Sequence, residues 1–78
     1  MNRDEIHKKL TAITYALYET VKEAGIDGAP SGYLYLACME HGISIDAYEA
    51  IMSVMVKRGI IRHANHVYYF VKPFEGDS

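Results

Sequence analysis

Hydrophobic residues recur at helical spacing through the first third of the chain. Between residues 4 and 24 the apolar positions follow one another at intervals of three or four: Ile6, Leu10, Ile13, Leu17, Val21 and Ala24. This spacing places them on one face and predicts an amphipathic helix over about 4–24. Asp4 and Glu5 favour its start because carboxylates stabilise the positive end of the helix dipole, and Gly25 favours a left-handed end.

A second helix is predicted over about 32–41, after a segment of turn-forming residues between 26 and 30. Ser31 is a candidate N-cap for this helix, and Gly42 ends it. Its residues are apolar over most of the circumference: Tyr33, Leu34, Leu36, Ala37, Cys38 and Met39. Because such a helix has almost no polar face for solvent, we expect it to be buried between its neighbours.

A third helix is predicted over about 45–58, and either Ser44 or Asp46 can cap its start. Gly59 ends this helix after a last turn that carries two basic residues. One broad side of the helix is apolar and is expected to face the core: Ile45, Tyr48, Ile51, Met52, Met55 and Val56.

β-Branched and aromatic residues dominate the C-terminal part of the chain. They lie on both sides of a small, polar interruption at Ala64 and Asn65, and they predict a β-hairpin over about 60–71. The interruption lacks the Asn-Gly pair of a two-residue turn, so the register is left open by one residue. The segment 73–78 is expected to form a frayed tail.

A series of residues links the end of the third helix to the hairpin: Met52, Val56, Gly59, Ile60, Ile61, Val67, Tyr69 and Val71. This series resembles the closing segment of winged helix-turn-helix domains, in which a glycine, two aliphatic residues and an aromatic-rich returning strand follow the third helix. The connection from Gly42 to Asp46 is similar to that family's turn between its second and third helices. The resemblance implies a mainly α fold with a C-terminal β-hairpin (α+β), a three-helix winged helix-turn-helix, as in small winged-helix proteins of bacteria and phages.

Composition narrows the class of protein further. The 78 residues suffice for one small domain, 1–78, and no apolar run approaches the roughly 20 residues that span a membrane. The mixed charge at the N-terminus is not followed by an apolar segment, so no secretory signal is expected. A lone cysteine cannot form an internal disulfide, which favours a cytoplasmic location.

The resemblance implies DNA binding, the commonest use of this fold. The net charge of −2 gives no overall basic excess, and two acids stand among the positions that would face the groove: Asp46, Ala47, Glu49, Ala50 and Ser53. Residues 57–72, in contrast, carry four basic side chains and no acid. We therefore predict a small regulator of transcription that binds DNA weakly or as a dimer, through Ser53, Lys57, Arg58, Arg62, His63, Asn65, His66 and Lys72.

Two other interpretations of these residues stay open. The basic residues can instead complement a helix end and keep exposed strands in solution. Asp46 and Glu49 favour a protein–protein interaction module that keeps the winged-helix fold without binding DNA, because carboxylates repel phosphate and pair with a basic protein partner.

Tyrosine is the unusual component of the chain, which has seven tyrosines and no tryptophan. A three-helix core covers only one face of the second strand, so we expect exposed aromatic residues unless a second chain or Phe74 covers them. The sequence thus predicts a homodimer with contacts through Tyr15, Tyr18, Tyr68 and Phe70.

Metal binding and catalysis have little support in the sequence. Cys38, His41, His63 and His66 are residue types that bind zinc, but their spacing is not that of a zinc finger. We interpret them as a buried cysteine and solvated histidines, and we predict no metal and no cofactor. The chain has no nucleophile elbow, phosphate-binding glycine loop or Cys–His pair with an orienting acid, so it is not expected to be an enzyme.

Overall fold

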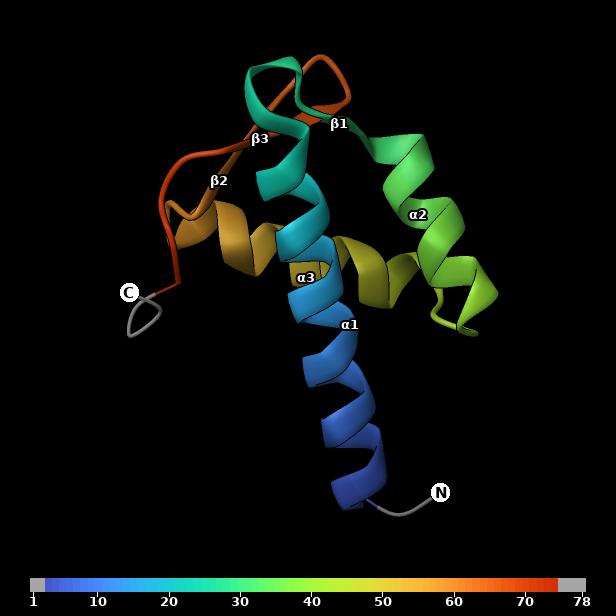
Figure 1. Ribbon diagram of the computed structural model, residues 1–78. Coiled ribbons are helices and arrows are strands. Elements are labelled where there is room, and N and C mark those ends of the chain that lie inside the picture. The colour runs from blue at the N-terminus through green and yellow to red at the C-terminus, as the bar shows by residue number, and fades with distance from the viewer. Residues whose placement is uncertain (1–2, 75–78) are drawn as a thin grey trace.

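The computed structural model describes residues 3–74 (Figure 1). In chain order its elements are the helix α1 (Arg3–Ala24), the 3-10 turn η1 (Gly25–Asp27), the strand β1 (Ala29–Pro30), the helices α2 (Ser31–Glu40) and α3 (Ile45–Lys57), and the strands β2 (Ile61–Ala64) and β3 (Val67–Phe70). The described part of the chain is thus mainly α with a small antiparallel sheet. The three predicted helices and the hairpin are confirmed, whereas β1 was not predicted.

The sheet has the order β1-β3-β2, so the central strand is the last of the strands described within residues 3–74. Ala64 pairs with Val67, which leaves Asn65 and His66 as a two-residue turn and settles the register of the hairpin. Both turn residues have positive φ, 53° and 63°. This left-handed pair follows the twist of the strands, as in a type I′ turn, although neither residue is glycine.

The unpredicted strand β1 lies against β3 because Gly28 lets the backbone approach. A Cβ atom at Gly28 would lie 2.7 Å from a ring carbon of Tyr69, and the residue has φ +76°. The pairing continues past the strand, since the Ser31 N–H donates to the His66 carbonyl at 2.8 Å. One side of the hairpin turn is therefore fastened to the start of α2.

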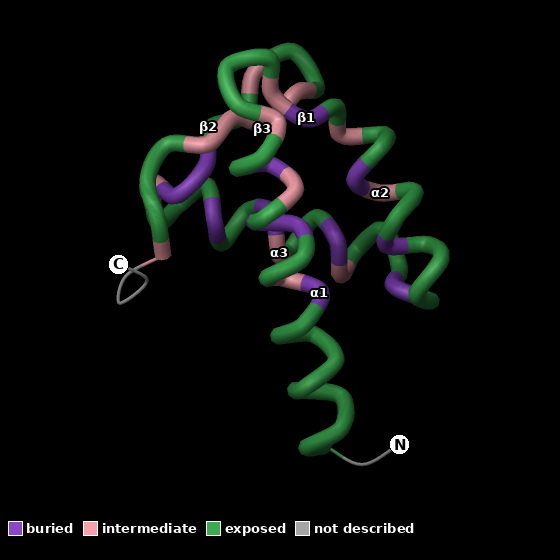
Figure 2. Tube along the Cα trace, in the orientation of Figure 1, coloured by how far each residue is buried: buried purple, intermediate pink, exposed green. Residues whose placement is uncertain are grey.

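The core gathers side chains from all three helices and the sheet, as the purple segments of Figure 2 show. The largest fully buried side chains are Tyr18, Leu34, Met52, Met55, Ile61, Val21 and Cys38. The cap of α3 is Ser44, whose hydroxyl accepts from the Ala47 N–H at 3.2 Å. Ser31 does not cap α2, contrary to expectation, because its hydroxyl is hydrogen-bonded to the Tyr48 hydroxyl at 2.9 Å instead.

The apolar stripe of α1 is buried only in its second half. Residues 3–12 are all exposed, and Figure 2 shows this half of the helix extending away from the other elements. Ile6 is 46% exposed, and burial of the stripe begins at Ile13. The turn between α2 and α3 comes close to α1 at Lys9, because a Cβ atom at Gly42 would lie 3.9 Å from Lys9 Nζ. The residues of α1 before Lys9 extend past this turn.

The expectation that α2 is buried between its neighbours is wrong for its outer side. Only Leu34 and Cys38 are buried, whereas Tyr33, Leu36 and Met39 are 63%, 51% and 50% exposed. No described element covers the outer side of α2. The apolar side of α3 is also exposed at its ends, at Ile45 and Val56.

The aromatic residues near the C-terminus are covered from within the chain. The ring centroid of Phe74 lies 4.4 Å from that of Tyr18 and 5.4 Å from that of Tyr15. Tyr18 and Tyr68 are buried and Phe70 is half-buried, so of the four aromatic residues expected on a dimer surface only Tyr15 is exposed. Phe74 is part of this packing and not of a frayed tail, while residues 75–78 of that predicted tail lie outside the described residues.

Within residues 3–74, no helix combines the length and hydrophobicity that a membrane span requires. The longest, α1, has 22 residues, but its mean hydropathy is lowered by charged residues at both ends.

Candidate nucleic-acid interface

The structure brings three of the eight predicted DNA-binding residues into one hollow. Ser53 and Lys57 are one turn apart on α3, and His63 lies across from them on β2. Together with Val56 and Tyr68 they line an open hollow of about 200 Å³ between the helix and the hairpin. This α3–hairpin hollow is the arrangement that could hold part of a nucleic-acid backbone.

The His63 ring is held flat against the hairpin. Its centroid lies 4.2 Å from that of Tyr68, and the two planes differ by only 8°. The pairing follows from the register, because His63 and Tyr68 are opposite each other on adjacent strands. Stacking limits the rotamers of an exposed imidazole, so its nitrogen atoms are presented to a ligand at a lower entropic cost.

Glu49 does not line the hollow, but its charge acts on Tyr68, which does. Burial raises the pKa of the Tyr68 hydroxyl, and the negative charge of Glu49 raises this pKa further. Glu49 precedes Ser53 by one helical turn and Lys57 by two, so α3 changes from acidic to basic along the side that faces the hairpin. Asp46 and Ala50 are also exposed near the start of α3, while Ala47 is half-buried. A phosphate is therefore favoured at the Lys57 end and disfavoured at the Glu49 end.

Arg58 and Lys72 lie in a different place. They line a second open hollow with Ile60, Pro73 and Phe74, beyond the end of α3. The chain returns to this point because the N–H groups of Val71 and Lys72 both donate to the Ile60 carbonyl, at 2.9 and 3.2 Å. These two cations form a neighbouring basic group and do not line the α3–hairpin hollow.

Arg62 lies on the opposite face of the hairpin from His63, because successive side chains of a strand alternate. Its guanidinium carbon lies 4.4 Å from the centroid of the Tyr69 ring. Because side chains alternate along a strand, the predicted hairpin already implies that Arg62 and His63 lie on opposite faces. The prediction of one DNA-binding surface missed this difference because it grouped all basic residues of segment 57–72 together.

The turn residues Asn65 and His66 are both exposed at the tip of the hairpin. Their position is fixed by the hydrogen bond from Ser31 to the His66 carbonyl. They are thus available to a ligand that extends past the end of the sheet.

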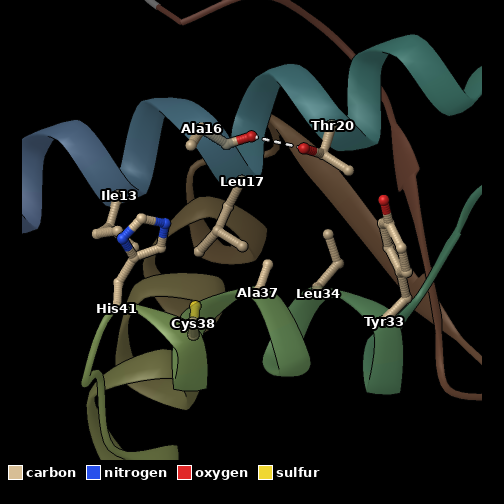
Figure 3. A pocket seen from close by; sticks show the side chains of 9 residues that line it. All are labelled: Ile13, Ala16, Leu17, Thr20, Tyr33, Leu34, Ala37, Cys38 and His41. Atoms are coloured by element: carbon tan, nitrogen blue, oxygen red, sulfur yellow. Dashed lines mark hydrogen bonds between the residues drawn. The ribbon is translucent and has the colours of Figure 1, made fainter.

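The cysteine and histidines that resemble zinc ligands are not brought together. Cys38 is buried between α1 and α2, where burial raises the pKa of its thiol, and His41 lies at the rim of the same pocket (Figure 3). His63 and His66 are on the hairpin. Among residues 3–74, no group of three His, Cys, Asp or Glu side chains could hold a metal ion.

The pocket between α1 and α2 is mainly apolar. Its walls are Ile13, Ala16, Leu17, Thr20, Tyr33, Leu34, Ala37, Cys38 and His41, and its cavity volume is about 90 Å³ (Figure 3). The hydroxyl of Thr20 is already used, since it donates to the Ala16 carbonyl at 2.8 Å. The pocket therefore offers a packing surface more than a set of reactive groups.

Comparisons with known proteins give no match: no protein-family model fits the chain, and neither the curated proteins nor the solved structures include one that is significantly similar.

Proposed function

We propose that the chain is a winged helix-turn-helix protein that binds DNA weakly or as a dimer and acts as a small regulator of transcription. The order of elements supports this proposal, because α2, a tight turn, α3 and a hairpin follow one another as in that fold. The observation that carries it is the α3–hairpin hollow, where Ser53, Lys57 and His63 converge from two elements. Fold alone would not carry a function.

The hollow suggests how a duplex would be held. Lys57 and His63 contact phosphates, Ser53 donates a hydrogen bond beside them, and the tip residues Asn65 and His66 reach along the adjacent groove. The acidic start of α3 stays farther from the phosphate backbone of the duplex, because Asp46 and Glu49 repel phosphate. Arg58 and Lys72 add to the positive field from the neighbouring hollow.

Fluorescence anisotropy with a mixed-sequence duplex tests the proposal, at about 50 and about 200 mM salt. Affinity should fall steeply with salt. Replacing Lys57 by Ala should weaken binding and reduce the log–log salt slope by about 0.9, the value of one phosphate contact. Lys8→Ala is the matched control, because Lys8 is also exposed but lies on the first half of α1. Absence of binding at the lower salt concentration, or equal behaviour of the two variants, would refute the proposal.

A second candidate function is supported by the exposed side of α2. Tyr33, Leu36 and Met39 form an apolar surface that no described element covers. Such a surface is typical of protein interfaces, so we propose as an alternative a protein–protein interaction module with the winged-helix fold. Light scattering on the wild type and on Leu36→Glu distinguishes a homodimer through this surface from a monomer.

A further inference from the structure

The face of the hairpin opposite the α3–hairpin hollow carries a second group of charged residues. Here η1 approaches β3, and an open hollow of about 410 Å³ is lined by Lys22, Gly25, Ile26, Arg62, Tyr69 and Phe70. We call this surface the η1–hairpin face. It joins the end of α1 to the sheet, so its two cations come from positions forty residues apart in the sequence.

Both cations of the η1–hairpin face rest on aromatic rings. The Arg62 guanidinium carbon lies 4.4 Å from the centroid of Tyr69, and Lys22 Nζ lies 5.7 and 5.9 Å from those of Tyr18 and Phe70. Cation–π contacts at these distances restrict long side chains that otherwise move freely. A restricted guanidinium loses less entropy when it forms a paired contact with a carboxylate.

Ile26 also lines this hollow and is 96% exposed. A single exposed isoleucine is ordinary on a protein surface and carries no argument by itself. Because Ile26 lines the same hollow as Lys22 and Arg62, this surface combines an apolar side chain with two cations. No carboxylate lines the described part of this hollow, although Glu23 and Asp27 are close in sequence.

We propose that the η1–hairpin face binds an acidic segment of a protein partner. Carboxylates of that segment pair with Arg62 and Lys22, and one of its apolar side chains covers Ile26. A duplex fits less well, since a phosphate backbone offers no apolar group to Ile26. A membrane is also less favoured, because one isoleucine side chain supplies far less apolar area than stable anchoring needs. The proposal is independent of the DNA-binding function, which uses the other face.

The test uses NMR shifts of the ¹⁵N-labelled chain on addition of a short synthetic peptide in which glutamate and leucine alternate. We expect shifts centred on Gly25, Ile26 and Tyr69, with none centred on the α3–hairpin hollow. The same peptide with glutamine in place of glutamate should bind more weakly, because its charges are gone. The double variant Lys22→Glu with Arg62→Glu should lower affinity about tenfold, since both pairs become repulsive.

Two further variants keep this test decisive. The double variant Lys8→Glu with Lys9→Glu makes the same charge change on the exposed first half of α1 and should leave peptide affinity unaltered. Ile26→Ser removes this apolar side chain without changing charge and should weaken binding on its own. Shifts that centre on Ser53, Lys57 and His63, no shifts at all, or wild-type affinity in the double variant of Lys22 and Arg62 would overturn the proposal. A thermal scan of each variant confirms that the fold is retained.

Discussion

At the scale of single residues, backbone conformation determines which residue type fits at positions that the hydrophobic pattern does not constrain. Gly28 combines φ +76° with a close approach to β3, so two separate constraints require glycine there. Gly32 has neither constraint, because its Cβ position has no heavy atom within 4 Å and its φ is not left-handed. The hairpin turn is the converse case, with Asn65 and His66 in a conformation that glycine adopts more easily.

The two glycines give a matched pair of substitutions. Gly28→Ala should destabilise the fold by about 1–3 kcal/mol, because the new methyl group meets the side chains of β3 at an unfavourable φ. Gly32→Ala should be neutral or stabilise the fold by up to about 1 kcal/mol, because alanine at a helical position lowers the conformational entropy of the unfolded chain. Urea unfolding of both variants measures the difference. Similar losses in the two variants would contradict the position assigned to β1.

His66 carries avoidable strain in the turn. His66→Gly should raise the free energy of unfolding by about 0.5–1 kcal/mol, because glycine adopts φ 63° without the steric cost that a Cβ imposes. Asn65→Gly should gain less, since asparagine tolerates this conformation better than histidine. Thermal unfolding of the two variants tests the order. A lower midpoint for His66→Gly would show that the histidine side chain stabilises the turn.

At the scale of elements, what is local in sequence could be predicted and what is distant could not. The helix ends at Gly25, Gly42 and Gly59 are local signals, and they place each boundary within about two residues. The strand β1 is only two residues long and forms through pairing with β3, so no sequence pattern within this segment predicts it. Which apolar residues are covered also depends on distant partners, and this is why α2 and the first half of α1 are more exposed than their patterns suggest.

The two halves of α1 should respond differently to truncation of a side chain. Leu17→Ala should cost about 2–5 kcal/mol, because Leu17 is buried among the helices and its loss leaves a cavity. Ile6→Ala should change stability by no more than about 0.5 kcal/mol in the monomer, since Ile6 lies on the exposed half. Chemical denaturation at low protein concentration measures both. Equal effects would contradict the boundary at Ile13.

Buried tyrosines should make the fold sensitive to alkaline pH. Burial raises the pKa of the Tyr48 and Tyr68 hydroxyls above their ordinary value of 10.0. Because the folded-state pKa exceeds the unfolded one, the resulting stability is complete below the unfolded pKa and is lost as the pH rises through the folded pKa. The free energy of unfolding should therefore fall above about pH 10, and the fall should be smaller in Tyr48→Phe. Urea titrations at several pH values test this, and a flat profile would contradict it.

At the scale of the whole molecule, folding separates charges that the sequence places in one segment. Lys57 and His63 line one hollow, Arg58 and Lys72 another, and Arg62 lies on the opposite face of the hairpin. A count of charges along the chain identifies the basic segment 57–72 but not how its side chains divide among these surfaces. That division depends on side-chain alternation along the strands and on where the chain returns after β3. The molecule thus presents distinct surfaces that substitutions can test one at a time.

The acidic end of α3 should limit DNA affinity. Replacing Asp46 by Asn and Glu49 by Gln removes two negative charges from the first two turns of α3 while keeping side-chain size, so binding to a mixed-sequence duplex should strengthen by several-fold at low salt. The gain should shrink at higher salt because exposed charges are screened. Anisotropy titrations compare the variant with wild type. Unchanged affinity in a chain that does bind would place the duplex away from α3.

The most direct test of the DNA-binding account is an NMR map of the duplex on the ¹⁵N-labelled chain. Addition of a mixed-sequence duplex at low salt should shift the amide signals of Ser53, Lys57 and His63 and those of the turn residues Asn65 and His66. Signals from the exposed sides of α2 and of the first half of α1 should stay in place. Shifts confined to α2 or to the η1–hairpin face, or no shifts at all, would contradict the account.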